Sequence, residues 1–205
     1  GRTVRPEETR PMTSPAPRRH FVRLTTSALG ALTLLAAAPW ARAAEEAPDA
    51  MIQRLSDDLL QTIRADKTLQ TGDVDRLMAV VDSKVMPNVN FTRMTAPATG
   101  PSCRKATPDH RQRLQPEFKN LLVRTYAGAL KQVSDQSVEV KPLRAAPNDK
   151  EVIVRTLVKS KGDPVQLDYR LERTPGQGSG WKIYDLNVLG VWLVDNYRPQ
   201  FSQQL

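Results

Sequence analysis

The last third of the chain alternates between apolar and polar positions in a pattern that predicts strands followed by a helix. Residues 181–187 carry large apolar or aromatic side chains on both faces, which is typical of a strand covered on two sides. After Gly190, apolar residues recur at helical spacing at Val191, Val194 and Tyr197. We therefore expect an apolar helix to lie back across a central strand, with a cavity enclosed between helix and sheet.

The remaining periodicity predicts an α+β fold in which helices cover a four-stranded antiparallel sheet. The predicted strands are residues 137–143, 151–159, 165–173 and 181–187. Upstream of them, helical spacing predicts amphipathic helices that begin near Asp49 and Asp73. A longer helix is predicted over residues 107–133, with a kink near Pro116 because proline removes a backbone hydrogen bond.

Residues 1–43 have the pattern of a cleaved export signal ahead of the fold. A basic region containing Arg18 and Arg19 precedes an apolar stretch at 24–38, and a small-x-small cleavage sequence ends at Ala43. The apolar stretch has about 15 residues, whereas a membrane-spanning helix needs about 20, so cleavage is favoured over anchoring. The adjacent arginines fit both the general secretory and the twin-arginine export routes.

Removal of the signal changes the composition of the protein. We expect translation to begin at Met12, residues 1–11 to be non-native, and residues 44–205 to form a single domain. The formal net charge of the whole chain is +8, but residues 1–43 carry seven basic and two acidic side chains, which leaves only +3. This small excess removes most of the argument for a nucleic-acid-binding protein.

Candidate catalytic groups are few. His110 is the one histidine outside the signal and lies in a charged helical stretch, where a solvated surface position is expected. Cys103, the single cysteine, cannot form an intramolecular disulfide and has no second histidine to form a nucleophile pair with it. Paired carboxylates such as Asp168 and Asp185 can serve as acid and base, but a structural role beside a basic neighbour such as Arg170 is favoured. We expect no catalytic site, no metal site and no cofactor.

Three motifs, in one consistent order, resemble the toluene-tolerance family. Residues 181–201 combine a WKxYD strand, a Gly-Val turn and an NYRxxF helix, and residues 117–130 read EFKxLLVRTYAxxL. The third motif pairs VRT at 154–156 with LDYRL at 167–171. Members of this family are the periplasmic phospholipid-binding component of the ABC system that maintains outer-membrane lipid asymmetry in Gram-negative bacteria. The loop at 97–105 departs from the family pattern, because it lacks the usual Leu-Gly and Trp-Arg pairs.

The resemblance implies a monomeric, non-enzymatic periplasmic carrier. Such a carrier shuttles diacyl phospholipid between an outer-membrane lipoprotein complex and an inner-membrane ABC transporter complex, with the lipid as cargo in an apolar cavity. The residues implied to line that cavity are Phe91, Leu121, Leu122, Tyr126, Val154, Tyr169, Val188, Val191, Leu193 and Val194. The competing interpretation is a non-enzymatic periplasmic interaction module with a filled apolar core and no lipid site, because a packed core produces the same apolar stripes.

Overall fold

The computed structural model describes residues 45–99, 107–130, 133, 135–143 and 145–204, all within one compact unit, Arg42–Leu205. The elements in chain order are α1 (Pro48–Ala65), α2 (Lys67–Gln70), α3 (Val74–Val80), the π-helix η1 (Val81–Val85), the 3-10 helix η2 (Met86–Asn88), α4 (Phe91–Thr99), α6 (Pro108–Leu130), β1 (Ser137–Val140), β2 (Glu151–Lys159), β3 (Val165–Arg173), β4 (Trp181–Val188), β5 (Val191–Trp192) and α7 (Leu193–Gln204). The predicted export signal and Cys103 lie outside the described residues. No helix in the described part is both long and apolar enough to cross a membrane.

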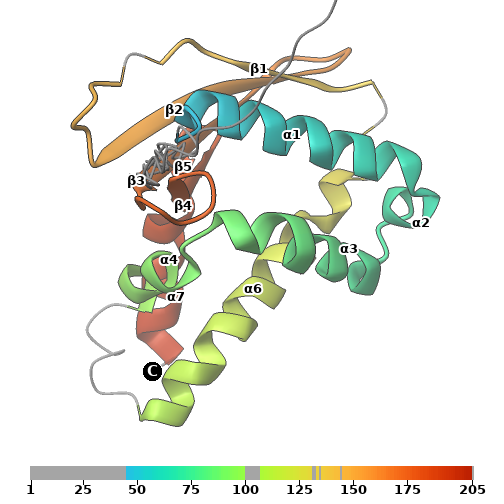
Figure 1. The fold of residues 1–205 in the computed structure, drawn as a ribbon. Helices are drawn as coiled ribbons and strands as arrows, with labels where there is room; N and C mark the ends of the chain where they lie inside the picture. The colour runs from blue at the N-terminus through green and yellow to red at the C-terminus, as the bar shows by residue number, and fades with distance from the viewer. Residues whose placement is uncertain (1–44, 100–106, 131–132, 134, 144, 205) are drawn as a thin grey trace, which may run out of the picture. The chain divides into compact units, whose positions relative to one another are not determined.

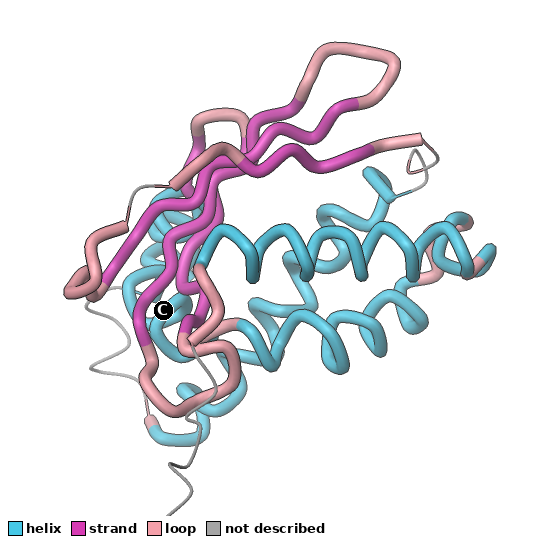
Figure 2. The backbone as a smooth tube through the Cα atoms, turned by 45° about the horizontal axis from the view of Figure 1, so that its top comes forward, coloured by secondary structure: helices cyan, strands magenta, loops and turns pink. Residues whose placement is uncertain are grey.

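The sheet is an antiparallel meander in the order β1-β2-β3-β4-β5, so each strand pairs with its neighbours in the chain (Figure 2). The predicted α+β class is confirmed, and all four predicted strands are present. The additional strand, β5, has only two residues, which is too short for an alternating pattern to be recognised. The helix α1 packs along one face of the sheet, and α3 and α6 lie on the same side (Figure 1).

Local signals in the sequence explain where the N-terminal helices begin and change. The Asp73 carboxylate accepts a hydrogen bond of 2.8 Å from the backbone N–H of Arg76, which is the N-cap that starts α3. The helix then widens into the π-helix η1, and Pro87 stands in the 3-10 turn that follows it. The single helix predicted from Asp73 is therefore three consecutive helical elements of different pitch. Helix α6 continues as one element through Pro116.

The start of α7 differs from the sequence-based prediction. Val191 was expected in the helix but belongs to β5, and the helix begins only at Leu193. The turn between β4 and β5 requires a left-handed backbone conformation at two residues, with φ of 53° at Leu189 and 90° at Gly190. The Asn187 side chain accepts a 2.8 Å hydrogen bond from the Gly190 N–H and so closes the turn. This tight hairpin ends β4 and turns the chain into α7.

Three separate clusters of buried apolar side chains hold the domain together. The first joins α1 to the sheet through residues such as Ile52 and Val154, and the second joins α1, α3 and α6. The third joins α4, α6 and α7 around Phe118, whose ring lies 5.8 Å from that of Phe91 and 5.3 Å from that of Tyr197, measured between centroids. A domain usually has one contiguous core. Here the clusters surround a cavity.

Candidate functional site

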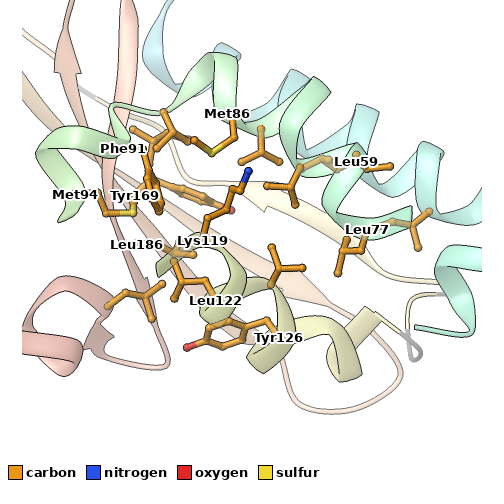
Figure 3. A pocket seen from close by; sticks show the side chains of 18 residues that line it. Leu59, Leu77, Met86, Phe91, Met94, Lys119, Leu122, Tyr126, Tyr169 and Leu186 are labelled. Atoms are coloured by element: carbon orange, nitrogen blue, oxygen red, sulfur yellow. The ribbon is translucent and has the colours of Figure 1, made fainter. Parts of the chain in front are cut away.

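An apolar cavity of about 370 Å³ lies among the helices and the sheet (Figure 3). This volume falls within the range of about 300–1,000 Å³ that is typical of small-molecule sites. The described residues that line it are Leu59, Ile63, Leu77, Val80, Val81, Val85, Met86, Val89, Phe91, Met94, Lys119, Leu122, Val123, Tyr126, Tyr169, Ile183, Leu186 and Leu193. Each of the three core clusters contributes to this lining.

The helical wall follows from the spacing of apolar residues. Leu59 and Ile63 are four residues apart on α1, so both face the same side of that helix. The π-helix η1 has wider turns than an α-helix, and it presents Val81 and Val85 together to the cavity. The 3-10 helix η2 follows η1 and begins with Met86, whose side chain lines the same wall.

The sheet wall depends on an irregularity in β4. In a regular strand Ile183 and Leu186 would point to opposite faces, because side chains alternate. The pairing of β3 with β4 shifts register between Arg170 and Leu171, which adds one residue to β4 at this point. Both Ile183 and Leu186 therefore line the cavity.

A buried carboxylate fixes the junction between the sheet and α7. Asp185 is only 2% exposed, and its Oδ1 accepts hydrogen bonds from the N–H groups of Leu186 and Val194. Its Oδ2 accepts a 3.0 Å hydrogen bond from Arg170, whose guanidinium lies 3.8 Å from the centre of the Trp192 ring. Burial raises the pKa of Asp185, while these hydrogen bonds and the Arg170 charge act in the opposite direction. The structural role predicted for this residue fits these contacts.

Two tyrosines and one lysine are the polar members of the lining among the described residues. Tyr169 lies deep in the domain but stays partly accessible, because its ring borders the cavity. Burial raises the pKa of Tyr169 to about 12, although hydrogen bonds with Thr156 and Ser56 oppose the shift. Burial also raises the pKa of Tyr126. Both phenols are therefore neutral at physiological pH, and neither adds charge to the cavity.

The raised pKa of Tyr169 predicts an alkaline loss of stability. An unfolded tyrosine ionises near pH 10, whereas Tyr169 in the folded protein holds its proton until about pH 12. Its contribution is therefore complete below pH 10 and lost as the pH rises towards 12, by about 2 to 3 kcal/mol. Urea unfolding of the wild type and of Tyr169→Phe between pH 8 and 12 measures this. The variant should lose less stability over that range, and equal losses would contradict the assignment.

Five of the ten residues predicted to line the cavity do so: Phe91, Leu122, Tyr126, Tyr169 and Leu193. The other five, Leu121, Val154, Val188, Val191 and Val194, lie outside the lining. Leu121 is 39% exposed, and Val191, which lies in β5, is 50% exposed. Val154 packs fully against α1, while Val188 and Val194 pack in the cluster around Phe118.

The sequence-based prediction missed most of the helical wall. Its residues Leu59, Ile63, Leu77 and Val80 belong to the amphipathic helices predicted from Asp49 and Asp73, but no pattern separates a cavity wall from a packed core. Lys119 was not among the predicted lining residues, because a charged side chain does not extend an apolar stripe. The spacing could have indicated its position. Lys119 precedes Leu122 by three residues, Val123 by four and Tyr126 by seven, so all four side chains lie on one face of the helix.

Among the described residues no group of three or more His, Cys, Asp or Glu side chains could hold a metal ion. The side chain of His110 lies outside the described part of the structure. The side chains that face the cavity are suited to holding an apolar molecule.

Comparison with known families matches residues 53–205 to the family described as MlaC protein. Toluene tolerance protein ttg2D of Pseudomonas putida is 27% identical over 177 residues, which cover 86% of this chain and 81% of that protein. The intermembrane phospholipid transport system binding protein MlaC of Haemophilus influenzae is 23% identical over 154 residues, covering 75% and 72%.

A solved structure shows a similar fold at higher identity. It is the phospholipid-binding protein from Ralstonia solanacearum in complex with a phospholipid, with 44% identity and a TM-score of 0.71. The match covers 76% of this chain and 85% of the other. These relatives confirm the resemblance to the toluene-tolerance family that the sequence motifs indicated.

Proposed function

The chain belongs to the MlaC family, and from this premise we propose that it is a periplasmic carrier that holds the acyl chains of a diacyl phospholipid in the cavity. The observation that carries the proposal is the cavity itself, with an apolar lining drawn from every layer of the domain. The Ralstonia solanacearum relative, which is 44% identical, binds a phospholipid. Because lining of this kind recognises hydrocarbon by burial, we propose selection mainly by the acyl chains.

The energetics of acyl chains dictate how such a carrier releases its cargo. Two chains hold about 30 methylenes at about 0.8 kcal/mol each, so exposing them to water would cost roughly 24 kcal/mol. Spontaneous release into water is therefore negligible. Transfer between a bilayer and an apolar cavity is nearly neutral by comparison, because both environments are apolar. Loading and unloading then depend on docking to a membrane complex.

The proposed partners are an outer-membrane lipoprotein complex and an inner-membrane ABC transporter complex, between which the protein shuttles as a monomer. The name of the Haemophilus influenzae relative, a binding protein of an intermembrane phospholipid transport system, supports this part of the proposal. The proposed role is non-enzymatic and needs no cofactor, since transfer of a lipid between apolar environments breaks no covalent bond. The energy for directional transport would come from the ATPase partner.

The alternative, an interaction module with a filled apolar core, is less well supported. A filled core would place the three clusters in direct contact, at the close packing that protein interiors normally reach. In the structure they border a space of about 370 Å³ instead. The cavity therefore favours the carrier over the filled module.

Native mass spectrometry tests the proposal directly. The protein should be expressed with its signal in a Gram-negative periplasm and purified without detergent. We expect it to carry diacyl phospholipid with mixed head groups, since the lining has few polar groups to select one of them. Spectra that show only the bare polypeptide, under conditions that keep lipid on a control carrier, would contradict the proposal.

A further inference from the structure

Lys119 is the one charged side chain among the eighteen described residues that line the cavity. Its aliphatic stem adds to the apolar wall, as lysine stems commonly do. Its Nζ lies 2.6 Å from Oδ1 of Asp82, and the Asp82 side chain is 50% exposed to solvent. The amine therefore lies where the apolar cavity meets water.

The ion pair also joins two walls of the cavity. Lys119 belongs to α6, whereas Asp82 belongs to η1, whose Val81 and Val85 face the cavity. A second pair holds η1 from the other side, because Lys84 Nζ lies 2.8 Å from Asp58 of α1. Lys84 does not line the cavity. The two lysines are thus chemically alike but differ in their access to the cavity.

A phospholipid with its tails in the cavity places its phosphate at the same boundary. The phosphodiester joins the apolar tails to the hydrated head group, so it must lie at the edge of the apolar space when the tails are buried. It is an anion with strong acceptor oxygens, which suits a lysine ammonium. Acyl-chain binding also holds the phosphate beside the amine at a high effective concentration.

We propose that Lys119 binds the phosphate of the bound lipid, and that this phosphate replaces Asp82 as the partner of the amine. The inference rests on the proposed function and adds to it a polar side chain that recognises the phosphate of the lipid. Since one anion replaces another, the exchange adds only a modest affinity. Uncharged diacyl lipids gain none of it, so the difference gives selectivity for phosphate-bearing lipids. The exchange also releases Asp82, so the ion pair between η1 and α6 is absent when lipid is bound.

The test compares two lipids that have the same acyl chains and differ in the phosphate. Delipidated protein is exchanged with mixed vesicles of phosphatidylglycerol and diacylglycerol, and the ratio of the two bound lipids is measured by mass spectrometry. We expect Lys119→Met to lower the ratio of bound phosphatidylglycerol to diacylglycerol about fivefold, because a charge-assisted hydrogen bond is lost. Lys119→Arg should keep the ratio high.

Two further variants distinguish this site from a general effect of charge or stability. Asp82→Asn removes the competing carboxylate and should raise the ratio, which a merely damaged fold would not do. Lys84→Met removes the same charge next to the cavity but should leave the ratio unchanged. An unchanged ratio in Lys119→Met, or an equal fall in Lys84→Met, would overturn the proposal.

The same experiment separates this inference from the proposed function. If the wild type takes up neither lipid, the carrier function itself fails. If it takes up both, and Lys119→Met leaves the ratio unchanged, only the role of Lys119 fails. Excess inorganic phosphate should not alter the ratio, because it lacks the acyl chains that hold the lipid phosphate in place. If excess inorganic phosphate lowers the ratio of the wild type to that of Lys119→Met, the site binds free phosphate instead.

Discussion

Leu122→Trp is expected to reduce the bound phospholipid at least several-fold, whereas Leu121→Trp should leave it unchanged. Leu122 lines the cavity, so the larger indole would occupy space that an acyl chain otherwise fills. Leu121 is the adjacent residue on α6 and is 39% exposed, so the same ring there would extend into solvent. The two variants add the same volume to the same helix turn and differ only in its direction.

Stability measured on the same samples shows whether the space is empty. In a close-packed core, overpacking would cost about 1–3 kcal/mol, but an empty cavity accepts the ring at a smaller cost. We expect delipidated Leu122→Trp to unfold in urea close to the wild type, while native mass spectrometry shows the loss of lipid. Full lipid load in Leu122→Trp, or loss in both variants, would exclude Leu122 from the lipid site.

Phe118→Ala is expected to destabilise the domain by about 3–5 kcal/mol. Phe118 is 1% exposed and lies between the rings of Phe91 and Tyr197, so its loss removes the contact that joins α4, α6 and α7. It does not line the cavity, so no pre-existing space compensates for the missing ring. Urea unfolding of the delipidated protein measures the change.

Leu121→Ala provides the matched control for this truncation. It shortens an apolar side chain on the same helix at an exposed position, where substitutions usually change stability by about 0.5 kcal/mol or less. The loss of stability in Phe118→Leu should lie between the losses in these two variants, since leucine keeps part of the buried volume. A loss for Phe118→Ala no larger than that for Leu121→Ala would show that the third cluster does not stabilise the fold.

The sequence predicted the strands and the α+β class well because alternation is a local property. Residues 165–172 alternate between apolar and polar side chains, and the strands predicted at 151–159 and 165–173 have these bounds in the structure. The register shift before Leu171 leaves no such signal, because it depends on how β3 meets β4. Val191 was assigned to a helix because Val191 and Val194 share helical spacing, but the tight turn at Gly190 holds Val191 in the sheet.

The cavity was predicted less completely, for a physical reason. Leu121 and Leu122 are adjacent apolar residues about 100° apart on a helix, and periodicity alone does not show which one faces inward. Val154 satisfies every criterion of an inward-facing strand residue, but the side it faces is filled by α1. A cavity is a place where packing is missing. Its location depends on the relative placement of elements, which the side-chain pattern within each element does not contain.

The meander order of the sheet bears on how the chain reaches its folded state. Each strand pairs only with strands next to it in sequence, so the hairpins from β1 to β5 close short loops. Contacts of this local kind form early in folding. The cavity, in contrast, needs partners far apart in the chain, such as Val89 and Ile183, whose backbones form an isolated bridge. From this difference in contact range we expect the strands to pair before the helical wall closes over them, so that the apolar face of the sheet stays accessible until the wall closes.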